Sequence, residues 1–499
     1  MDIFRTKSVE QSIRDTEAPE HQLRKRLTAT DLTVFGIGVI VGTGIFVLTG
    51  QVAKEMAGPA VAISFIVAGV VCGLAALCYA EFASTIPVAG SAYTFSFATL
   101  GEFPAWVIGW DLMLELALAA AVVAVGWSGY FASMLESVGL ELPAAIAGED
   151  PVVNVPAVVI VFVLTAILVA GIKLSSRVNL ILVVTKIAVV LLVIVAGLFF
   201  LKLANYTPFV PEAVPTPLVE GLKAPLLQVA FGITPVAFGV LGIFSAAAIV
   251  FFAFIGFDIV ATAAEETINP QRDVPRGIIG SLAICTALYV AVSLVVVGMQ
   301  RYSELSTTAP LSDAFISVGQ PWLAGIISVG AIAGLTTVVL VLLMGQTRVL
   351  FAMCRDGLLP RSLAKVHPHY GTPARLTVVI GVVTMALAGF VSFGELAELV
   401  NIGTLFAFVV VSIGVVILRR TRPDLPRAFK APLVPVLPIV SVLACLYLMF
   451  NLPVQTWLRF LVWMLIGLVV YGLFGYWNSR GTTLLHQVRG SRQRTRGRP

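Results

Sequence analysis

The sequence predicts an all-α membrane protein with twelve transmembrane helices, and three observations lead to this fold class. Apolar residues make up 58% of the 499 residues and charged residues only 12%, whereas a soluble domain carries roughly 25% charged residues. The apolar residues gather in runs of about the 20 residues that a spanning helix needs. Runs such as VVIVFVLTAILVAGI lack the alternating polarity of a transmembrane β-strand. This composition excludes a soluble enzyme, a disordered chain and a nucleic-acid-binding protein.

Twelve segments are long and apolar enough to be spanning helices. In chain order they are residues 31–54, 59–85, 103–130, 154–171, 177–201, 240–268, 276–299, 322–350, 376–392, 397–418, 433–453 and 456–478.

The positions of lysine and arginine predict how these helices cross the membrane. With a cytoplasmic N-terminus, 26 of the 32 Lys and Arg residues fall in cytoplasmic segments, five fall in extracellular segments, and Lys186 remains in mid-span. Cytoplasmic loops carry an excess of Lys and Arg, so both termini are expected in the cytoplasm of a plasma-membrane protein. The basic C-terminal tail is expected to be solvated or to contact anionic lipid weakly.

The spans and loops divide the chain into six parts. These are a cytoplasmic N-terminal segment (1–30), a first five-helix unit (31–201), an extracellular loop (202–239), a second five-helix unit (240–420), helices 11 and 12 (421–478), and the basic cytoplasmic tail (479–499).

The first span contains an unusual number of glycines, in DLTVFGIGVIVGTGIFVLTG. Each glycine costs a helix about 1 kcal/mol relative to alanine, so the cluster Gly42-Thr43-Gly44 predicts a helix that unwinds in mid-membrane. Unwound backbone is tolerated there only where it lines a cavity. Its free N–H groups can then bind an anion and its free carbonyls an ammonium group. The alternative is close helix packing through small residues.

The sixth span has a corresponding weak point. Gly256 lies next to Asp258 in FFAFIGFD, within SAAAIVFFAFIGFDIVATAAEETINP. Spans 1 and 6 hold equivalent positions in the two five-helix units, and paired interruptions of this kind indicate a transporter site between inverted repeats. A zwitterion suits such a site, because backbone groups can bind both of its charges.

Several motifs resemble those of the amino acid–polyamine–organocation transporters. They are GIGVIVGTGIFVLTG, FFAFIGFD followed by EETINPQRDVPRGI, and GQTRVLFAMCRDGLLP after the eighth span. Within that superfamily, roughly residues 25–478 are most similar to the cationic amino acid transporters and their bacterial relatives. The resemblance implies a leucine-transporter-like fold: a 5+5 inverted repeat with helices 1 and 6 broken, plus two C-terminal helices. It also implies proton-coupled uptake of L-amino acids.

The resemblance also implies a substrate site. The carboxylate would bind the amides of Thr43 and Gly44, and the ring of Phe252 would form a gate over the substrate. The amino group would bind carbonyls at Ile40, Val41, Phe252, Ala253 and Ile255, with Gly42 in the unwound stretch. Further pocket positions are Glu115, Leu342, Leu343 and Met344. The last three vary within the family, so the accepted side chains stay open.

Lys186 and Glu115 are charged residues in mid-span, where a charge costs about 2.5 kcal/mol or more. Lys186 would pin span 1 against span 5, or its protonation would couple to substrate binding, or both; it is too far from either end to snorkel. Glu115 would tune the pocket or carry a proton, or it is a neutral carboxyl bonded to backbone. Salt bridges are expected to close a cytoplasmic vestibule, drawn from Glu81, Asp258, Glu265, Glu266, Arg272, Arg276, Arg348 and Arg355.

The predicted function is a secondary active importer of L-amino acids by proton symport and alternating access, with neutral and broad specificity. The alternatives are a transporter or exchanger of cationic amino acids, polyamines or other organic cations, and an amino acid sensor that does not transport. An enzyme is not expected, because no catalytic triad, metal cluster or phosphate loop is present in the sequence. The expected partners are the amino acid, the proton and the bilayer, with no cofactor, no metal and no nucleic acid.

Overall fold

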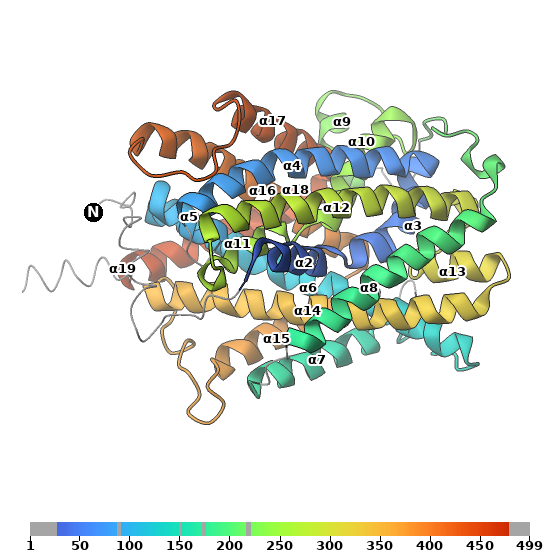
Figure 1. The fold of residues 1–499 in the computed structure, drawn as a ribbon, viewed down its shortest axis with the longest axis horizontal. Helices are drawn as coiled ribbons and strands as arrows, with labels where there is room; N and C mark the ends of the chain where they lie inside the picture. The colour runs from blue at the N-terminus through green and yellow to red at the C-terminus, as the bar shows by residue number, and fades with distance from the viewer. Residues whose placement is uncertain (1–26, 87–90, 149–150, 172–175, 216–220, 479–499) are drawn as a thin grey trace, which may run out of the picture.

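The computed structural model describes residues 27–86, 91–148, 151–171, 176–215 and 221–478. In these residues the backbone forms helices joined by loops, with isolated β-bridges and no extended strand. Eight helical segments are long and apolar enough to cross a membrane, and four shorter apolar helices accompany them. The long helices run side by side along the longest axis of the molecule (Figure 1). The protein is therefore an all-α membrane protein, as the sequence predicts.

The long helical segments are built on eight helices. They are α4 (Val61–Thr85), α6 (Glu102–Ser137), α8 (Ser176–Gly197), α10 (Gly239–Val250), α12 (Pro270–Met299), α14 (Pro321–Asp356), α16 (Phe393–Thr421) and α18 (Val454–Val470). The shorter apolar helices are α2 (Ala29–Ile40), α7 (Val155–Val169), α15 (Ala374–Phe390) and α17 (Val436–Phe450).

Small helical elements complete the described chain. Those that the argument below uses are the π-helical turn η1 (Gly44–Leu48), α3 (Thr49–Val52), the π-helical turn η2 (Ala53–Ala57), the 3₁₀ turn η8 (Phe251–Phe254), α11 (Phe257–Thr262) and the 3₁₀ turn η9 (Ala264–Glu266). The others include α5 (Ser91–Thr99), α9 (Leu226–Ala230), α13 (Pro310–Ser317) and α19 (Tyr476–Asn478).

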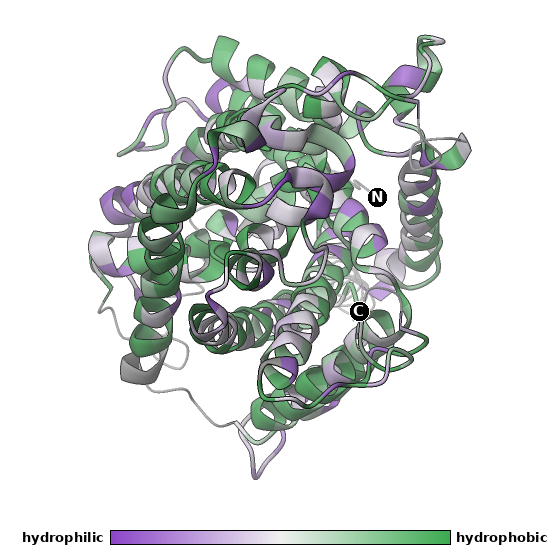
Figure 2. Ribbon diagram, turned by 90° about the vertical axis from the view of Figure 1, so that its right-hand side faces the viewer, coloured by the Kyte–Doolittle hydropathy of each residue, from purple (hydrophilic) through white to green (hydrophobic). Residues whose placement is uncertain are grey.

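Burial separates central helices from peripheral ones. The most apolar stretch of the segment Glu102–Glu136 in α6 is 83% buried, whereas that of the segment Val454–Asn478, which begins with α18, is only 22% buried. Large apolar side chains such as Phe162 on α7 and Phe390 on α15 are more than 60% exposed, and hydrophobic residues dominate the helices seen end-on (Figure 2). Such a surface would be unfavourable in water and suits lipid. The lipid contact predicted for the basic tail concerns residues 479–499, which lie outside the described residues.

A buried ion pair joins the end of α4 to the last turn of α16 and to the loop that follows it. The carboxylate of Glu81 is 2% exposed and accepts from Arg419 Nε at 2.8 Å and Nη2 at 2.6 Å. Arg427 Nε lies 3.4 Å from the same carboxylate, and the Ala431 N–H donates to it at 2.8 Å. Glu81 therefore binds arginines that the sequence analysis did not assign to it, because these lie more than 330 residues further along the chain.

Replacing Glu81 with alanine is expected to destabilise the protein by about 3 kcal/mol, because Arg427 would be left buried without its carboxylate. The measurement is thermal unfolding in detergent, where the midpoint should fall by several degrees. The matched control is Asp424→Ala, since Asp424 pairs with Arg422 at 3.2 Å on the surface and exposed pairs contribute little. An equal shift in the two variants would contradict a stabilising role for the Glu81 pair.

Candidate functional site

The first element of the site is the stretch where regular helix stops after α2. The α2 helix ends at Ile40, Val41 is extended (φ −70°, ψ 94°), and helical backbone resumes at Gly44. The Gly42 carbonyl accepts from the N–H groups of Ile45 and Phe46 at 3.2 and 3.3 Å. Helical backbone then continues through α3 and η2. The first N–H groups of a helix have no partner within it, so this junction offers donors beside the carbonyls that end α2.

The second element is the corresponding stretch after α10. Here α10 passes into η8, Ile255 is extended (φ −63°, ψ 137°), and Gly256 has φ 117° before α11 begins. This positive φ favours glycine. A Cβ at Gly256 would also lie 2.6 Å from Val39 Cγ1. The glycine therefore permits both the turn and the close approach of α2.

Backbone contacts join the two stretches. A Cβ at Gly44 would lie 2.2 Å from Ala253 Cα, so η1 and η8 touch without a side chain between them. The Tyr289 hydroxyl on α12 lies 2.7 Å from the Ile40 carbonyl oxygen and 2.8 Å from that of Ala253. One hydroxyl proton can serve only one acceptor at a time. Tyr289 therefore holds together the carbonyls that end the two helical stretches.

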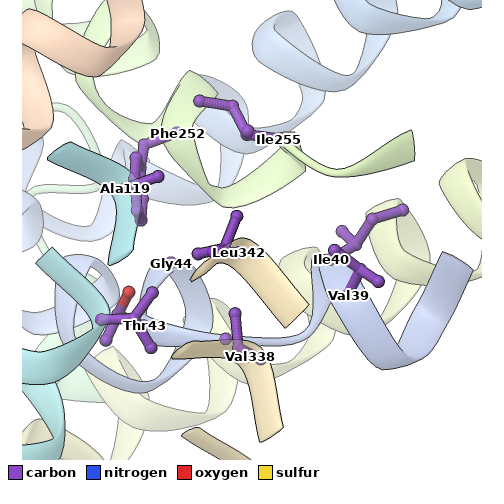
Figure 3. A pocket seen from close by; sticks show the side chains of 11 residues that line it. Val39, Ile40, Thr43, Gly44, Ala119, Phe252, Ile255, Val338 and Leu342 are labelled. Atoms are coloured by element: carbon purple, nitrogen blue, oxygen red, sulfur yellow. The ribbon is translucent and has the colours of Figure 1, made fainter. Parts of the chain in front are cut away.

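A small cavity lies beside these stretches (Figure 3). Its side-chain wall is apolar apart from Thr43, with Ala119 and Val123 from α6 and Val338 and Leu342 from α14. Thr43 is fully buried, and its hydroxyl has no hydrogen-bond partner among the described residues. The full lining is Val39, Ile40, Gly42, Thr43, Gly44, Ala119, Val123, Phe252, Ile255, Val338 and Leu342. Backbone groups and one hydroxyl are thus the polar groups that face a ligand there.

The structure brings together seven of the residues predicted for the site. Ile40, Gly42, Thr43, Gly44, Phe252, Ile255 and Leu342 line the cavity. Six others do not line it: Val41, Ala253, Glu115, Lys186, Leu343 and Met344. Four lining residues and Tyr289 were not predicted. Helix periodicity could have revealed three of them, because Ala119 and Val123 follow Glu115 at intervals of four on α6 and Val338 precedes Leu342 by four on α14.

Lys186 lies behind the cavity, on α8, and is fully buried. Its ammonium group donates to the Gly38 carbonyl, to the Val41 carbonyl at 3.3 Å and to Thr337 Oγ1 at 3.5 Å. The salt bridges of the described residues include none to this ammonium. Lys186 therefore satisfies carbonyls at the end of α2 and ties them to α8 and α14.

Glu115 is a second buried ionisable group, with a side chain 2% exposed. The Thr404 side chain on α16 lies beside its carboxyl, which also interacts electrostatically with Asp258 and Asp111. Its Oε2 has no hydrogen-bond partner in the described part of the chain. Glu115 thus lies among other acids and outside the cavity wall.

Comparison with known proteins shows the family to which this chain belongs. The sequence model described as amino acid permease matches residues 27–474, and the chain belongs to this family of membrane transporters. It is 50% identical to the branched-chain amino acid permease BcaP of Bacillus subtilis, over 96% of this chain and 98% of that protein. It is 48% identical to the methylthioribose transporter of the same organism, over 97% and 99%. It is 40% identical to the vacuolar cationic amino acid transporter 4 of Arabidopsis thaliana, over 81% and 65%. The family resemblance read from the motifs is confirmed.

Replacing Tyr289 with phenylalanine is expected to raise the KM for an amino acid by about tenfold, with a smaller change in maximal rate. The two carbonyls would lose their shared donor, at a cost of about 1–3 kcal/mol for an unpaired buried group, and their spacing would relax. Initial uptake rates over a range of concentrations measure this. The control is Tyr206→Phe. It removes a hydroxyl that donates to the Leu294 carbonyl at a distance of 2.8 Å, and neither residue lines the cavity. Similar kinetics in the two variants would contradict the role given to Tyr289.

Proposed function

We propose that this protein is a secondary active importer of L-amino acids, neutral and broad in specificity, driven by proton symport through alternating access. The observation that carries the proposal is the cavity where two interrupted helical stretches meet: its polar groups are backbone groups and the Thr43 hydroxyl, and its side-chain wall is otherwise apolar. Such a site can bind the two charges of a zwitterion without a charged side chain. It fits a leucine-transporter-like arrangement of two inverted repeats with broken first and sixth helices.

In this proposal the substrate bridges the two stretches. Its carboxylate binds the amides of Thr43 and Gly44, where the helical stretch that continues through η2 begins. Its ammonium group binds carbonyls from Ile40, Val41, Phe252, Ala253 and Ile255, and the Phe252 ring covers it. Its side chain then faces Ala119, Val123, Val338 and Leu342.

The apolar wall favours neutral amino acids over the alternatives. Glu115 does not line the cavity, so a cationic side chain or the second amine of a polyamine would lack a counter-charge. The hydroxyl groups of a sugar such as methylthioribose would find Thr43 as the one polar side chain there, and unpaired buried hydroxyls cost roughly 1–3 kcal/mol each. Branched aliphatic side chains suit this wall best.

Proton coupling is assigned to Lys186, with Glu115 as a second carrier. The charged ammonium of Lys186 donates to the carbonyls at the end of α2. Loss of its proton would remove charge-assisted bonds, which are roughly twice as strong as neutral ones. The shape of the site and the state of the proton would therefore depend on each other. The 26 Lys and Arg residues that fall on one side of the predicted spans favour cytoplasmic termini, and we propose the plasma membrane as the location.

The test is uptake into proteoliposomes that contain the purified protein. An inward proton gradient should drive accumulation of labelled valine, leucine and alanine, and a protonophore should abolish it. Arginine, putrescine and methylthioribose should compete poorly. Accumulation that requires sodium and ignores the protonophore would refute proton symport, and binding without accumulation would indicate a sensor.

A further inference from the structure

A buried amide on α16, the tenth predicted span, contacts the interrupted part of the sixth span. Asn401 lies on this helix and is fully buried. Its Nδ2 donates to the carbonyl oxygens of Ala248 and Ile249, at 2.9 Å in each case. An amide nitrogen carries two protons. Asn401 can therefore serve both carbonyls at the same time.

Both carbonyls lie in the last turn of α10, directly before the 3₁₀ turn η8. The last four carbonyls of an α-helix have no N–H partner within that helix, and Ala248 and Ile249 belong to this group. A 3₁₀ turn also has poorer hydrogen-bond geometry than an α-helix. The Oδ1 atom of Asn401 has no hydrogen-bond partner in the described part of the chain, so the hydrogen bonds of this side chain there are both to α10. Its two donors thus stabilise the junction at which α10 gives way to η8.

A second side chain of α16 packs on both sides of the same interruption. Phe408 follows Asn401 by seven residues, which is about two helical turns, so the two side chains lie on one face of α16. The centroid of its ring lies 5.6 Å from that of Phe251 and 5.0 Å from that of Phe257. Phe251 is the first residue of η8, and Phe257 is the first residue of α11. One face of α16 therefore supports the stretch from the end of α10 to the start of α11.

Lys186 makes the corresponding contact for the first span. From α8, the fifth predicted span, it donates to the carbonyls of Gly38 and Val41 at the end of α2. In the predicted arrangement of two five-helix units, spans 1 and 5 correspond to spans 6 and 10. Each interruption then has a buried donor from the last helix of its own unit. The two donors differ in chemistry, because an ammonium group can lose its proton whereas an amide stays neutral and keeps both of its protons.

We propose that Asn401 is a positioning residue of the substrate site, which holds η8 so that its carbonyls meet the ammonium group of the amino acid. This rests on the proposed function, in which the carbonyls of Phe252, Ala253 and Ile255 bind that group. Asn401 does not line the cavity, so it acts through the backbone of η8. Because its amide does not titrate, the sixth span keeps this support whether or not Lys186 carries its proton.

The test measures recognition of the two ends of the substrate separately. Leucine is compared with 4-methylpentanoate, which is leucine without its amino group, as an inhibitor of leucine exchange at equal pH on both sides of a proteoliposome. In Asn401→Leu, which has a similar volume and no donor, the affinity for leucine should fall about tenfold, because two buried carbonyls lose their partner. The affinity for 4-methylpentanoate should stay almost unchanged, since it has no ammonium group for η8 to bind. The KM for leucine should rise with a smaller change in the maximal exchange rate.

Two further variants complete the comparison. Ser412→Ala is the matched control, because Ser412 is a fully buried polar residue of the same helix whose hydroxyl lies 3.0 Å from that of Ser441 on α17. It should keep both affinities. Asn401→Ser retains one hydroxyl donor, so about half of the lost free energy should return and the affinity for leucine should fall only about threefold. This variant decides the question should Asn401→Leu not fold.

Several results would overturn the proposal. An unchanged affinity for leucine in folded Asn401→Leu, or in Asn401→Ser where only that variant folds, would mean that η8 does not depend on this amide. Equal losses for leucine and 4-methylpentanoate would mean that Asn401 supports the fold in general and not the ammonium subsite. An equal loss in Ser412→Ala would mean that any buried polar group of α16 has the same effect. Wild type that exchanges no amino acid would instead refute the proposed function itself, and the role of Asn401 with it.

Discussion

Uptake of amino acids is expected to fall at least about 100-fold when Lys186 is replaced by methionine. Methionine preserves much of the length of the side chain but provides no donor to the carbonyls of Gly38 and Val41 or to Thr337. Each buried acceptor left without a partner costs about 1–3 kcal/mol, and 1.36 kcal/mol corresponds to a factor of ten. Two such losses at the end of α2 account for the expected factor.

The measurement is the initial uptake rate in proteoliposomes, together with the thermal stabilisation that substrate gives to the purified protein. Lys202→Met is the matched control, because Lys202 is exposed and lies outside the predicted spans. Wild-type uptake with an unchanged response to pH in Lys186→Met would refute the role proposed for this residue.

An arginine at position 186 separates the two roles given to Lys186. Arginine can donate to the same carbonyls, but it stays protonated at any pH that the protein experiences. If Lys186 carries the coupled proton, Lys186→Arg should retain exchange of internal for external amino acid at equal pH and lose accumulation driven by the proton gradient. Loss of both activities would indicate that the fit of the side chain, rather than its proton, limits transport.

The sequence was sufficient to predict an all-α membrane protein and its family, because both depend on local patterns. Each run of apolar residues can be recognised without knowledge of the other spans, and the motifs around Gly42–Gly44 and Gly256 are continuous in sequence. The α2 helix ends at Ile40, two residues before that glycine cluster, and η1 begins at Gly44, the last residue of the cluster. Glycine weakens a helix at its own position in the sequence, so the place where the helix ends can also be predicted from local sequence.

Contacts between distant spans could not be predicted in the same way. In the sequence, Tyr289 cannot be told from any other aromatic residue of a buried helix. Its role depends on a hydroxyl that contacts carbonyls of two other segments. Glu81 was expected near arginines of the cytoplasmic loops, and it pairs with Arg419 and Arg427. In both cases the partner is set by how helices pack, which a single sequence does not specify.

The side chains that line the cavity could not all be predicted from the sequence either. The family motif pointed to Leu342, Leu343 and Met344, but successive residues on a helix are about 100° apart, so only one of the three lines the cavity. Val338, four residues before Leu342, shares its face and lines the cavity too. The correct choice among them required the orientation of α14 about its axis.

Replacing Gly44 with alanine is expected to abolish uptake. The new Cβ would lie 2.2 Å from Ala253 Cα and 2.4 Å from Ala253 Cβ. Overpacking of a side chain typically costs about 1–3 kcal/mol, and here the obstacle includes a backbone atom that cannot rotate away. The stretches at η1 and η8 would be forced apart, and the amides and carbonyls proposed to bind the two ends of the substrate would no longer match its length. Uptake and substrate-induced thermal stabilisation should both be lost.

Gly73→Ala is the matched control, because a Cβ there would meet no atom within 4 Å and alanine favours a helix over glycine by roughly 0.5–1 kcal/mol. It should retain uptake and unfold at the same temperature or slightly higher. Adding Ala253→Gly to Gly44→Ala tests which atom matters: it removes the Cβ of residue 253 but leaves the Cα 2.2 Å away. We therefore expect little recovery of uptake in the double variant. Full recovery would mean that the two stretches can separate by the width of a methyl group without losing the substrate, which contradicts a site built from two backbones held in direct contact.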